Sequence, residues 1–172
     1  MAKNDADQPV TQPLIDRLMD RDKDRDRDRS VPPTGANDPY RSRSASVRGL
    51  KAALRRDLEW LLNTRRDPNA ASDTMPELSQ SLFNYGLPDF STLTVNSPKD
   101  RQQLLGEIER TLALFEPRLR YVRVILLEAS GSARAVRFQI EGSLQMDPSP
   151  EHVSFDAELQ VASGEYQIRG ER

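Results

Sequence analysis

The sequence predicts a two-layer α+β domain in which helices come first and a mostly antiparallel sheet of about four strands follows. Between positions 44 and 115, apolar residues recur at steps of three and four, which is the period of a helix. After Pro117 the period changes to two, which is typical of strands with one buried and one wet face. Pro117 marks the change because proline lacks an amide proton and clashes with a continuing helix.

The composition excludes several classes of function. The 172 residues include 25 basic and 27 acidic side chains, so no strong positive field favours nucleic-acid binding. The chain has no cysteine, and His152 is its one histidine, which excludes disulfide frameworks, thiolate nucleophiles and multi-histidine metal centres. No apolar run approaches the roughly 20 residues of a membrane span, and the N-terminus lacks the apolar core of a signal peptide. We therefore expect a soluble cytoplasmic protein with no cofactor.

Residues 1–43 are predicted to form a disordered or partner-binding tail, and residues 44–172 a folded domain. Residues 20–29 alternate in sign, sum to zero and contain no apolar side chain, which is typical of a solvated spacer. Upstream, Leu14 and Leu18 belong to a short apolar helical stripe that is too short to be stable alone. Two compatible interpretations remain open, namely a plain spacer and a tethered peptide that folds on a partner.

Residues 44–66 form the first predicted helix, with Ser44 or Ser46 as its N-cap. Its apolar stripe consists of Val47, Leu50, Leu54, Leu58 and Leu61. Trp60 falls well off the centre of this stripe. It either packs under a neighbouring loop or forms an exposed aromatic anchor for a partner.

Two further helices are predicted before Pro117. A short one spans residues 75–83, and Gly86 is free to take positive φ in the break after it. The next begins at Ser97, a capping residue, with Pro98 at the first helical position and Asp100 three residues after the cap.

Four strands are predicted after Pro117. Residues 119–128 are apolar on both faces in their second half, which predicts a strand that is covered on both sides. Residues 135–146 and 153–161 alternate between apolar and polar side chains. A tight turn at residues 163–164 then leads into a strand at residues 166–169.

Glu116 and Arg118 flank Pro117 at the corner where the helical layer meets the sheet. Two opposite charges held at such a corner form either a structural ion pair, with each other or with Asp57, or a docking site for a partner. The residues alone leave both interpretations open.

Catalysis has little support in the sequence. A glycosidase would need one protonated and one ionised carboxyl group, and Arg118 lies too close to Glu116 for that residue to serve as a general acid. The sequence contains no phosphate-binding loop, metal-ligand cluster or nucleophile elbow. The acids of the helical half are Asp57, Glu59, Glu77, Asp89, Glu107 and Glu116.

Three motifs occur in order: RRDLEWLLNTRR at 55–66, SLFNYGLPDF at 81–90 and FEPRL at 115–119. Together with PLIDRLMD at 13–20, they resemble the TssE family, the baseplate components of bacterial type VI secretion systems. That family belongs to the lysozyme-like baseplate wedge proteins of phage tails, the sheath initiators of contractile machines.

The resemblance implies a structural, non-catalytic role despite the lysozyme label. It implies that Glu116, Pro117 and Arg118 dock on the wedge core of TssF and TssG, with TssK in the assembled baseplate. It also implies that the sheet starts the TssB/TssC sheath by strand exchange, in a baseplate at the inner face of the cell envelope. The alternatives are a peptidoglycan-degrading muramidase and the equivalent subunit of a contractile phage tail.

Overall fold

The computed structural model describes residues 10, 13–16, 18, 43–68, 75–90, 97–127 and 135–171. Its contacts divide the chain into two units, Met1–Leu54 and Arg55–Arg172. The predicted spacer at residues 20–29 lies outside the described residues, as does most of the predicted tail.

Among its described residues, the first unit contains two helical stretches. Residues 14–16 and 18 are helical, and the side chains of Leu14 and Leu18 are exposed. Helix α2 (Arg43–Asn63) begins in this unit and ends in the second. Ser44 and Ser46 lie inside α2, so the prediction that one of them caps it was wrong. The predicted apolar stripe is confirmed at its buried positions, which are Leu50, Leu54, Leu58 and Leu61.

The region predicted as one helix at residues 75–83 is two short helices. Helix α3 (Pro76–Ser79) ends after one turn, and the 3-10 helix η2 (Leu82–Asn84) follows it. Ser81 separates the two because its hydroxyl accepts a hydrogen bond from the Phe83 N–H and caps η2. Gly86 then takes the expected positive φ, +99°.

Helix α4 (Pro98–Phe115) has the predicted start and end. The Ser97 hydroxyl accepts a hydrogen bond of 3.3 Å from the Asp100 N–H, and Pro98 occupies the first turn. The helix ends at Phe115, before Pro117. Its buried side chains are Leu104, Ile108, Thr111 and Leu112.

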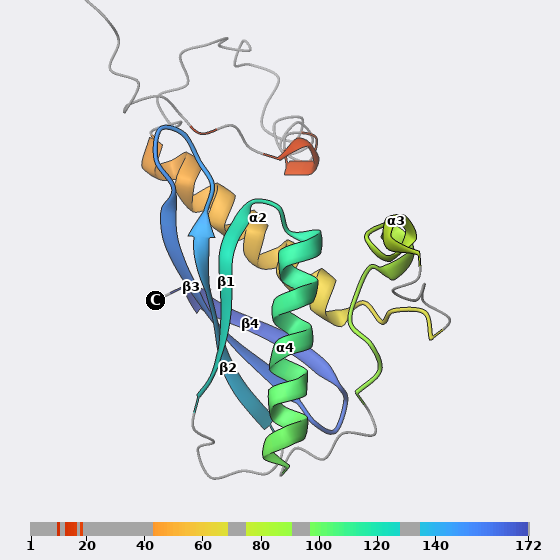
Figure 1. The fold of residues 1–172 in the computed structure, drawn as a ribbon. Coiled ribbons are helices and arrows are strands. Elements are labelled where there is room, and N and C mark those ends of the chain that lie inside the picture. The colour runs from red at the N-terminus through yellow and green to blue at the C-terminus, as the bar shows by residue number, and fades with distance from the viewer. Residues whose placement is uncertain are drawn as a thin grey trace, which may run out of the picture. The chain divides into compact units, whose positions relative to one another are not determined.

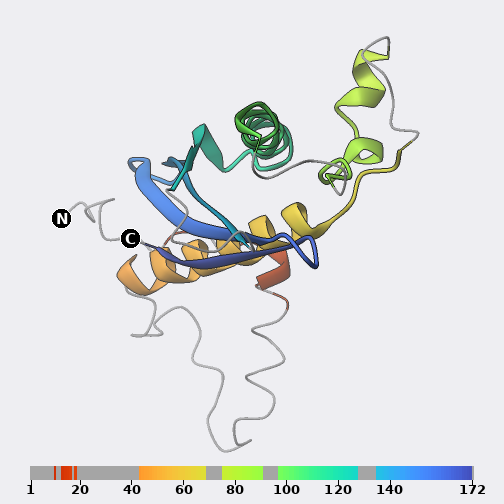
Figure 2. The ribbon, with the colours of Figure 1, turned by 90° about the horizontal axis from the view of Figure 1, so that it is seen from below.

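The second unit contains an antiparallel sheet of four strands in the order β1-β2-β3-β4 (Figure 1). The strands are β1 (Leu119–Leu126), β2 (Ala135–Leu144), β3 (Glu151–Gln160) and β4 (Glu165–Glu171). Helix α4 packs against β1, and Figure 2 looks along this helix beside the twisted sheet. The predicted α+β class, helices first and sheet second, is confirmed.

Strand β1 differs from its prediction because it is an edge strand. Its side chains are mostly exposed rather than covered on both faces, and Tyr121 is 88% exposed. The register with β2 shifts between Arg120 and Arg123, and Tyr121 takes a φ of +56° within this bulge. A run of apolar residues indicates a strand but does not say where the strand lies in the sheet.

Strand β3 also departs from simple alternation. Ser154 and Glu158, which the sequence places on the wet face, are both buried. Glu158 accepts a hydrogen bond from Arg137 on β2 at 3.2 Å and forms an ion pair with Arg169 on β4 at 3.0 Å. The long arginine side chains of the two flanking strands cover the carboxylate that they pair with.

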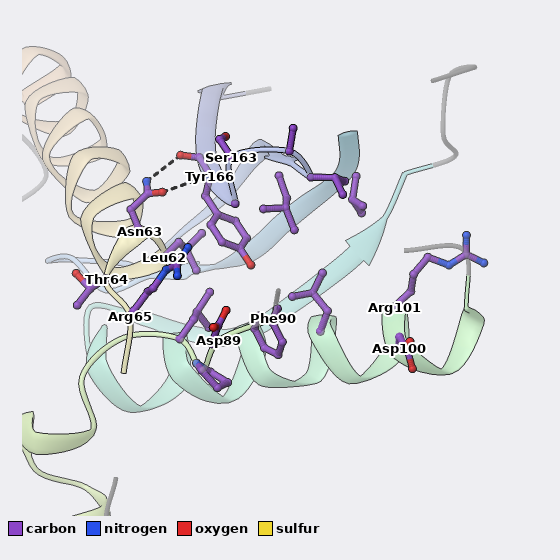
Figure 3. Close-up of a pocket in the computed structure, with 18 residues that line it drawn as sticks. Leu62, Asn63, Thr64, Arg65, Asp89, Phe90, Asp100, Arg101, Ser163 and Tyr166 are labelled. Carbon is purple, nitrogen blue, oxygen red and sulfur yellow. Dashed lines mark hydrogen bonds between the residues drawn. The ribbon is translucent and has the colours of Figure 1, made fainter. Parts of the chain in front are cut away.

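Both sheet edges are bonded by side chains from the helices. On β1, the Val124 N–H donates to the Glu109 carboxylate of α4 at 2.7 Å. On β4, the Tyr166 N–H donates to Asn63 Oδ1 at 2.9 Å, and Asn63 Nδ2 donates to the Tyr166 carbonyl at 2.8 Å (Figure 3). The amide at the end of α2 therefore pairs with β4 as a neighbouring strand would.

Candidate docking site

The corner between α4 and β1 is built within four residues. The Glu116 N–H donates to the Leu112 carbonyl at 2.9 Å and completes the last turn of α4. The Leu119 N–H then donates to the Glu116 carbonyl at 3.1 Å, which closes a turn around the exposed Pro117. Proline fixes φ inside this turn, so the directions of the Glu116 and Arg118 side chains are set by rigid backbone.

Arg118 joins two carboxylates at this corner. Its Nε donates to one oxygen of Glu116 at 2.6 Å, and its Nη2 donates to the other. The same Nη2 donates to Asp57 Oδ2 on α2 at 2.7 Å. Of the two interpretations that the sequence left open, the structure shows the ion pair, in which Arg118 bonds both Glu116 and Asp57. This pair satisfies a Glu116 side chain that is 7% exposed.

The electrostatic effect of this arrangement is seen on Arg118. The hydrogen bond to Glu116 raises the pKa of the Arg118 guanidinium above its ordinary value; burial lowers it, and Asp57 adds to the rise. Arg118 is therefore a permanent cation. Its positive charge links α2 to the corner through Asp57 and Glu116.

The network extends from Asp57 to Trp60. Asp57 Oδ1 accepts a bond of 2.8 Å from Arg56 Nη2. The Arg56 guanidinium carbon lies 5.0 Å from the centre of the Trp60 ring, one helical turn further along α2. We call Glu116, Arg118, Asp57, Arg56 and Trp60 the corner network. It connects two sets of residues that the sequence singled out separately.

Trp60 is 54% exposed, which agrees with the interpretation of an aromatic anchor better than with packing under a loop. Pro117 is exposed as well. Leu14 and Leu18 are exposed in the first unit, whereas the corner network lies wholly in the second.

Tyr85 is a neighbour of the network that the sequence did not reveal. Its ring packs edge-on against Phe115 with centroids 5.3 Å apart. Burial raises the pKa of the Tyr85 hydroxyl, and the charges of Asp57 and Glu116 raise it further. Gly86 is the local signal that could have located Tyr85. A Cβ at Gly86 would lie 2.3 Å from the Thr64 carbonyl oxygen, so the glycine lets this loop approach the end of α2 closely.

Two of the acids considered for glycoside hydrolysis, Asp57 and Glu116, are bonded to Arg118. Both oxygens of Glu116 accept N–H groups, which arranges this carboxyl as an acceptor and not as a proton donor. Within the part of the chain that is described, no group of three or more His, Cys, Asp or Glu side chains is arranged to hold a metal.

The second unit also contains a cavity of about 320 Å³, which the sequence did not predict (Figure 3). It lies between the end of α2, the first half of α4 and the β3–β4 hairpin. Its lining mixes apolar and polar side chains, and the charged residues that contribute to it are Arg65, Asp89, Asp100 and Arg101. Burial raises the pKa of the Tyr166 hydroxyl on its wall.

Comparisons with known proteins bear on residues 48–149. The family model described as "Baseplate wedge protein gp25" matches this range, which includes the corner network, α4, β1 and β2. No match is found among the curated proteins or among the solved structures. Among the described helices, none has the length and apolarity needed to cross a bilayer.

Proposed function

The chain belongs to the family of the baseplate wedge protein gp25, which includes TssE, and we propose that it is a non-catalytic subunit of a type VI secretion baseplate. In this proposal it docks on the TssF and TssG wedge core, joins TssK in the assembled baseplate and initiates the TssB/TssC sheath. The baseplate would stand in the cytoplasm at the inner face of the cell envelope.

The observation that supports docking most strongly is the corner network. It places Glu116, Pro117 and Arg118 next to Asp57, from which the network continues to the exposed Trp60. The corner network and Pro117 lie inside residues 48–149, the range that the family model matches. A preorganised surface of this kind loses little side-chain freedom on binding, which favours a stable interface.

The sheet edges support the proposal that the sheath starts on this subunit. The order of the strands makes β1 and β4 the edges. A bulge at Tyr121 and the Glu109 carboxylate obstruct β1. On β4, the hydrogen bonds described for Asn63 lie at Tyr166, and the register with β3 shifts beyond Ile168, toward the end of the strand. We therefore propose that an incoming sheath strand pairs with β4 around Ile168, where the backbone faces the same way as at Tyr166.

The tail supports a secondary contact. We propose that residues 1–43 form a tether whose Leu14 and Leu18 side chains bind a baseplate partner, because both are apolar and exposed. Replacing both leucines by serine tests this role separately from the corner network.

Co-purification with TssF and TssG tests the docking proposal. We expect the wild-type protein to form the complex and a folded Arg118→Ala variant to lose it. Arg110→Ala is the matched control, because Arg110 is an arginine on exposed α4 surface that pairs only one turn away with Glu107. Circular dichroism confirms that each variant is folded. Normal binding by folded Arg118→Ala would contradict docking at the corner.

A further inference from the structure

The guanidinium of Arg118 directs N–H donors toward acids of its own chain. Its Nε and Nη2, one side of the guanidinium fork, are bonded to Glu116 and Asp57 within the same chain. Its side chain is 26% exposed. An arginine that recognises a partner's carboxylate in bidentate fashion presents such a fork outward.

Building on the proposed function, we propose that Arg118 positions the docking surface without being its contact residue. In this arrangement the contact surface is the Trp60 ring with the Arg56 guanidinium stacked on it, and the wedge-core segment that meets it is uncharged and apolar. Arg118 acts on that surface through Asp57.

Asp57 connects the two arginines through separate oxygens. Its Oδ2 accepts from Arg118 at 2.7 Å, and its Oδ1 accepts from Arg56 Nε at 3.1 Å and Nη2 at 2.8 Å. Two bonds from one guanidinium to one oxygen restrict both its position and its plane. Movement of Asp57 would therefore move Arg56.

Arg56 and Trp60 are one turn apart on α2, and the guanidinium carbon lies 5.0 Å from the ring centre. The stack limits the rotamers of the indole, which is 54% exposed. A large aromatic side chain that is exposed and already ordered is the usual form of an interface hot spot.

The charges of the network indicate the chemistry of the partner. Arg118 is bonded to both Asp57 and Glu116, and Arg56 is bonded to Asp57. Docking over this surface therefore covers charges that already have partners within the chain, and these charges need no charged group opposite to them. The indole ring offers mainly apolar area, so an uncharged apolar segment fits it best.

The test measures the affinity of the full-length protein for the purified TssF–TssG complex. We expect Trp60→Ala to weaken binding by about tenfold or more and Trp60→Phe to retain most of it. Asp57→Asn and Arg118→Lys, which keep the size of each side chain, are expected to weaken binding. Combining either with Trp60→Ala is expected to add little, because each acts through Trp60. Affinity is expected to change little with salt concentration.

Trp60 also supplies a direct readout, because it is the only tryptophan of the chain. In the free protein, Asp57→Asn and Arg118→Lys are expected to shift its fluorescence emission and increase its quenching by acrylamide. Arg110→Ala, the control on α4, is expected to leave both unchanged. Circular dichroism shows which variants are folded. If the Arg118 variant is not folded, Asp57→Asn alone provides the test.

Four outcomes would overturn the inference. In the first, Trp60→Ala binds like the wild type while a folded Arg118 variant does not bind. In the second, the Arg118 and Asp57 variants lose binding although the fluorescence emission and acrylamide quenching of Trp60 are unchanged. A steep loss of affinity with salt would indicate a charged partner segment. In these three cases the proposed function stands, because the corner still docks. Failure of the wild type to bind TssF–TssG would overturn both.

Discussion

Arg118 and Asp57 are 61 positions apart in the sequence, and the Arg118 Nη2 lies 2.7 Å from the Asp57 Oδ2. The bond ties the middle of α2 to the turn between α4 and β1. Because Arg118 also neutralises the buried Glu116, the fold depends on the same residue that we place at the docking site.

Arg118→Ala should lower the free energy of unfolding by about 3–5 kcal/mol, because it leaves the buried Glu116 carboxylate without its partner. Arg110→Ala removes an exposed pair with Glu107 and should cost about 1 kcal/mol or less. Urea unfolding of the two variants measures the difference. Similar losses would contradict a structural role for the Arg118 pair.

Two glycine substitutions should have opposite effects on stability. Gly86→Ala should destabilise by about 1–3 kcal/mol, since Gly86 has a φ of +99° and its Cβ would lie 2.3 Å from the Thr64 carbonyl oxygen. Gly106→Ala should stabilise by about 0.5–1 kcal/mol, because Gly106 is inside α4 and nothing lies within 4 Å of its Cβ position. Thermal unfolding of both variants checks the two signs. A gain in stability for Gly86→Ala would contradict the prediction and show that the loop around Gly86 can move to accommodate a Cβ.

The buried hydroxyl of Tyr166 should make the fold sensitive to alkaline pH. Burial raises the pKa of Tyr166, so the folded state holds this proton more tightly than the unfolded chain does. The corresponding stability is complete below the unfolded pKa of about 10 and is lost as the pH rises above it. The Tm of Tyr166→Phe should therefore fall less than the Tm of the wild type between neutral pH and about pH 11. Tyr121→Phe, at an 88% exposed site, should follow the wild type, and equal curves for all three proteins would refute the prediction.

Asn63→Ala should expose the backbone of β4 at Tyr166. The amide of Asn63 bonds both the N–H and the carbonyl of Tyr166, so its removal should cost about 1–3 kcal/mol. Hydrogen exchange should become faster at the Tyr166 amide. The amide of Val124, which Glu109 protects on the opposite edge, is the internal reference. Its exchange rate should rise only as much as the global loss of stability requires.

A murein-degradation assay separates the structural role from a muramidase. We expect no hydrolysis, because the two acids at the corner serve Arg118 as hydrogen-bond acceptors. Hydrolysis by the wild type that Glu116→Gln or Asp57→Asn abolishes would establish an active site at the corner instead.

The order of the elements could be predicted from the sequence because capping residues, prolines and apolar periods are local signals. Ser97 and Pro117 set the limits of α4 by rules that involve only neighbouring residues. The position of β1 could not be predicted in this way. Its apolar run is the same whether a strand lies at the centre or the edge of a sheet, and in this fold it lies at the edge.

The candidate site could be predicted only in pieces. Trp60 and Arg118 were each identified by residue type and by their place in a motif. Arg56 connects them only because α2 and the corner meet in the folded chain. The place of Tyr85 beside Asp57 and Glu116 likewise depends on how closely Gly86 approaches Thr64, which the residue order does not determine.

The bulge at Tyr121 has a consequence for the subunit before it is assembled. Newly made copies that wait in solution meet one another, and a flat, regular edge strand would let two copies zip together through their backbones. The positive φ of Tyr121 breaks the regular spacing of backbone donors and acceptors along β1 and twists the strand locally. This irregularity makes β1 a poor template for backbone pairing between two copies of the chain.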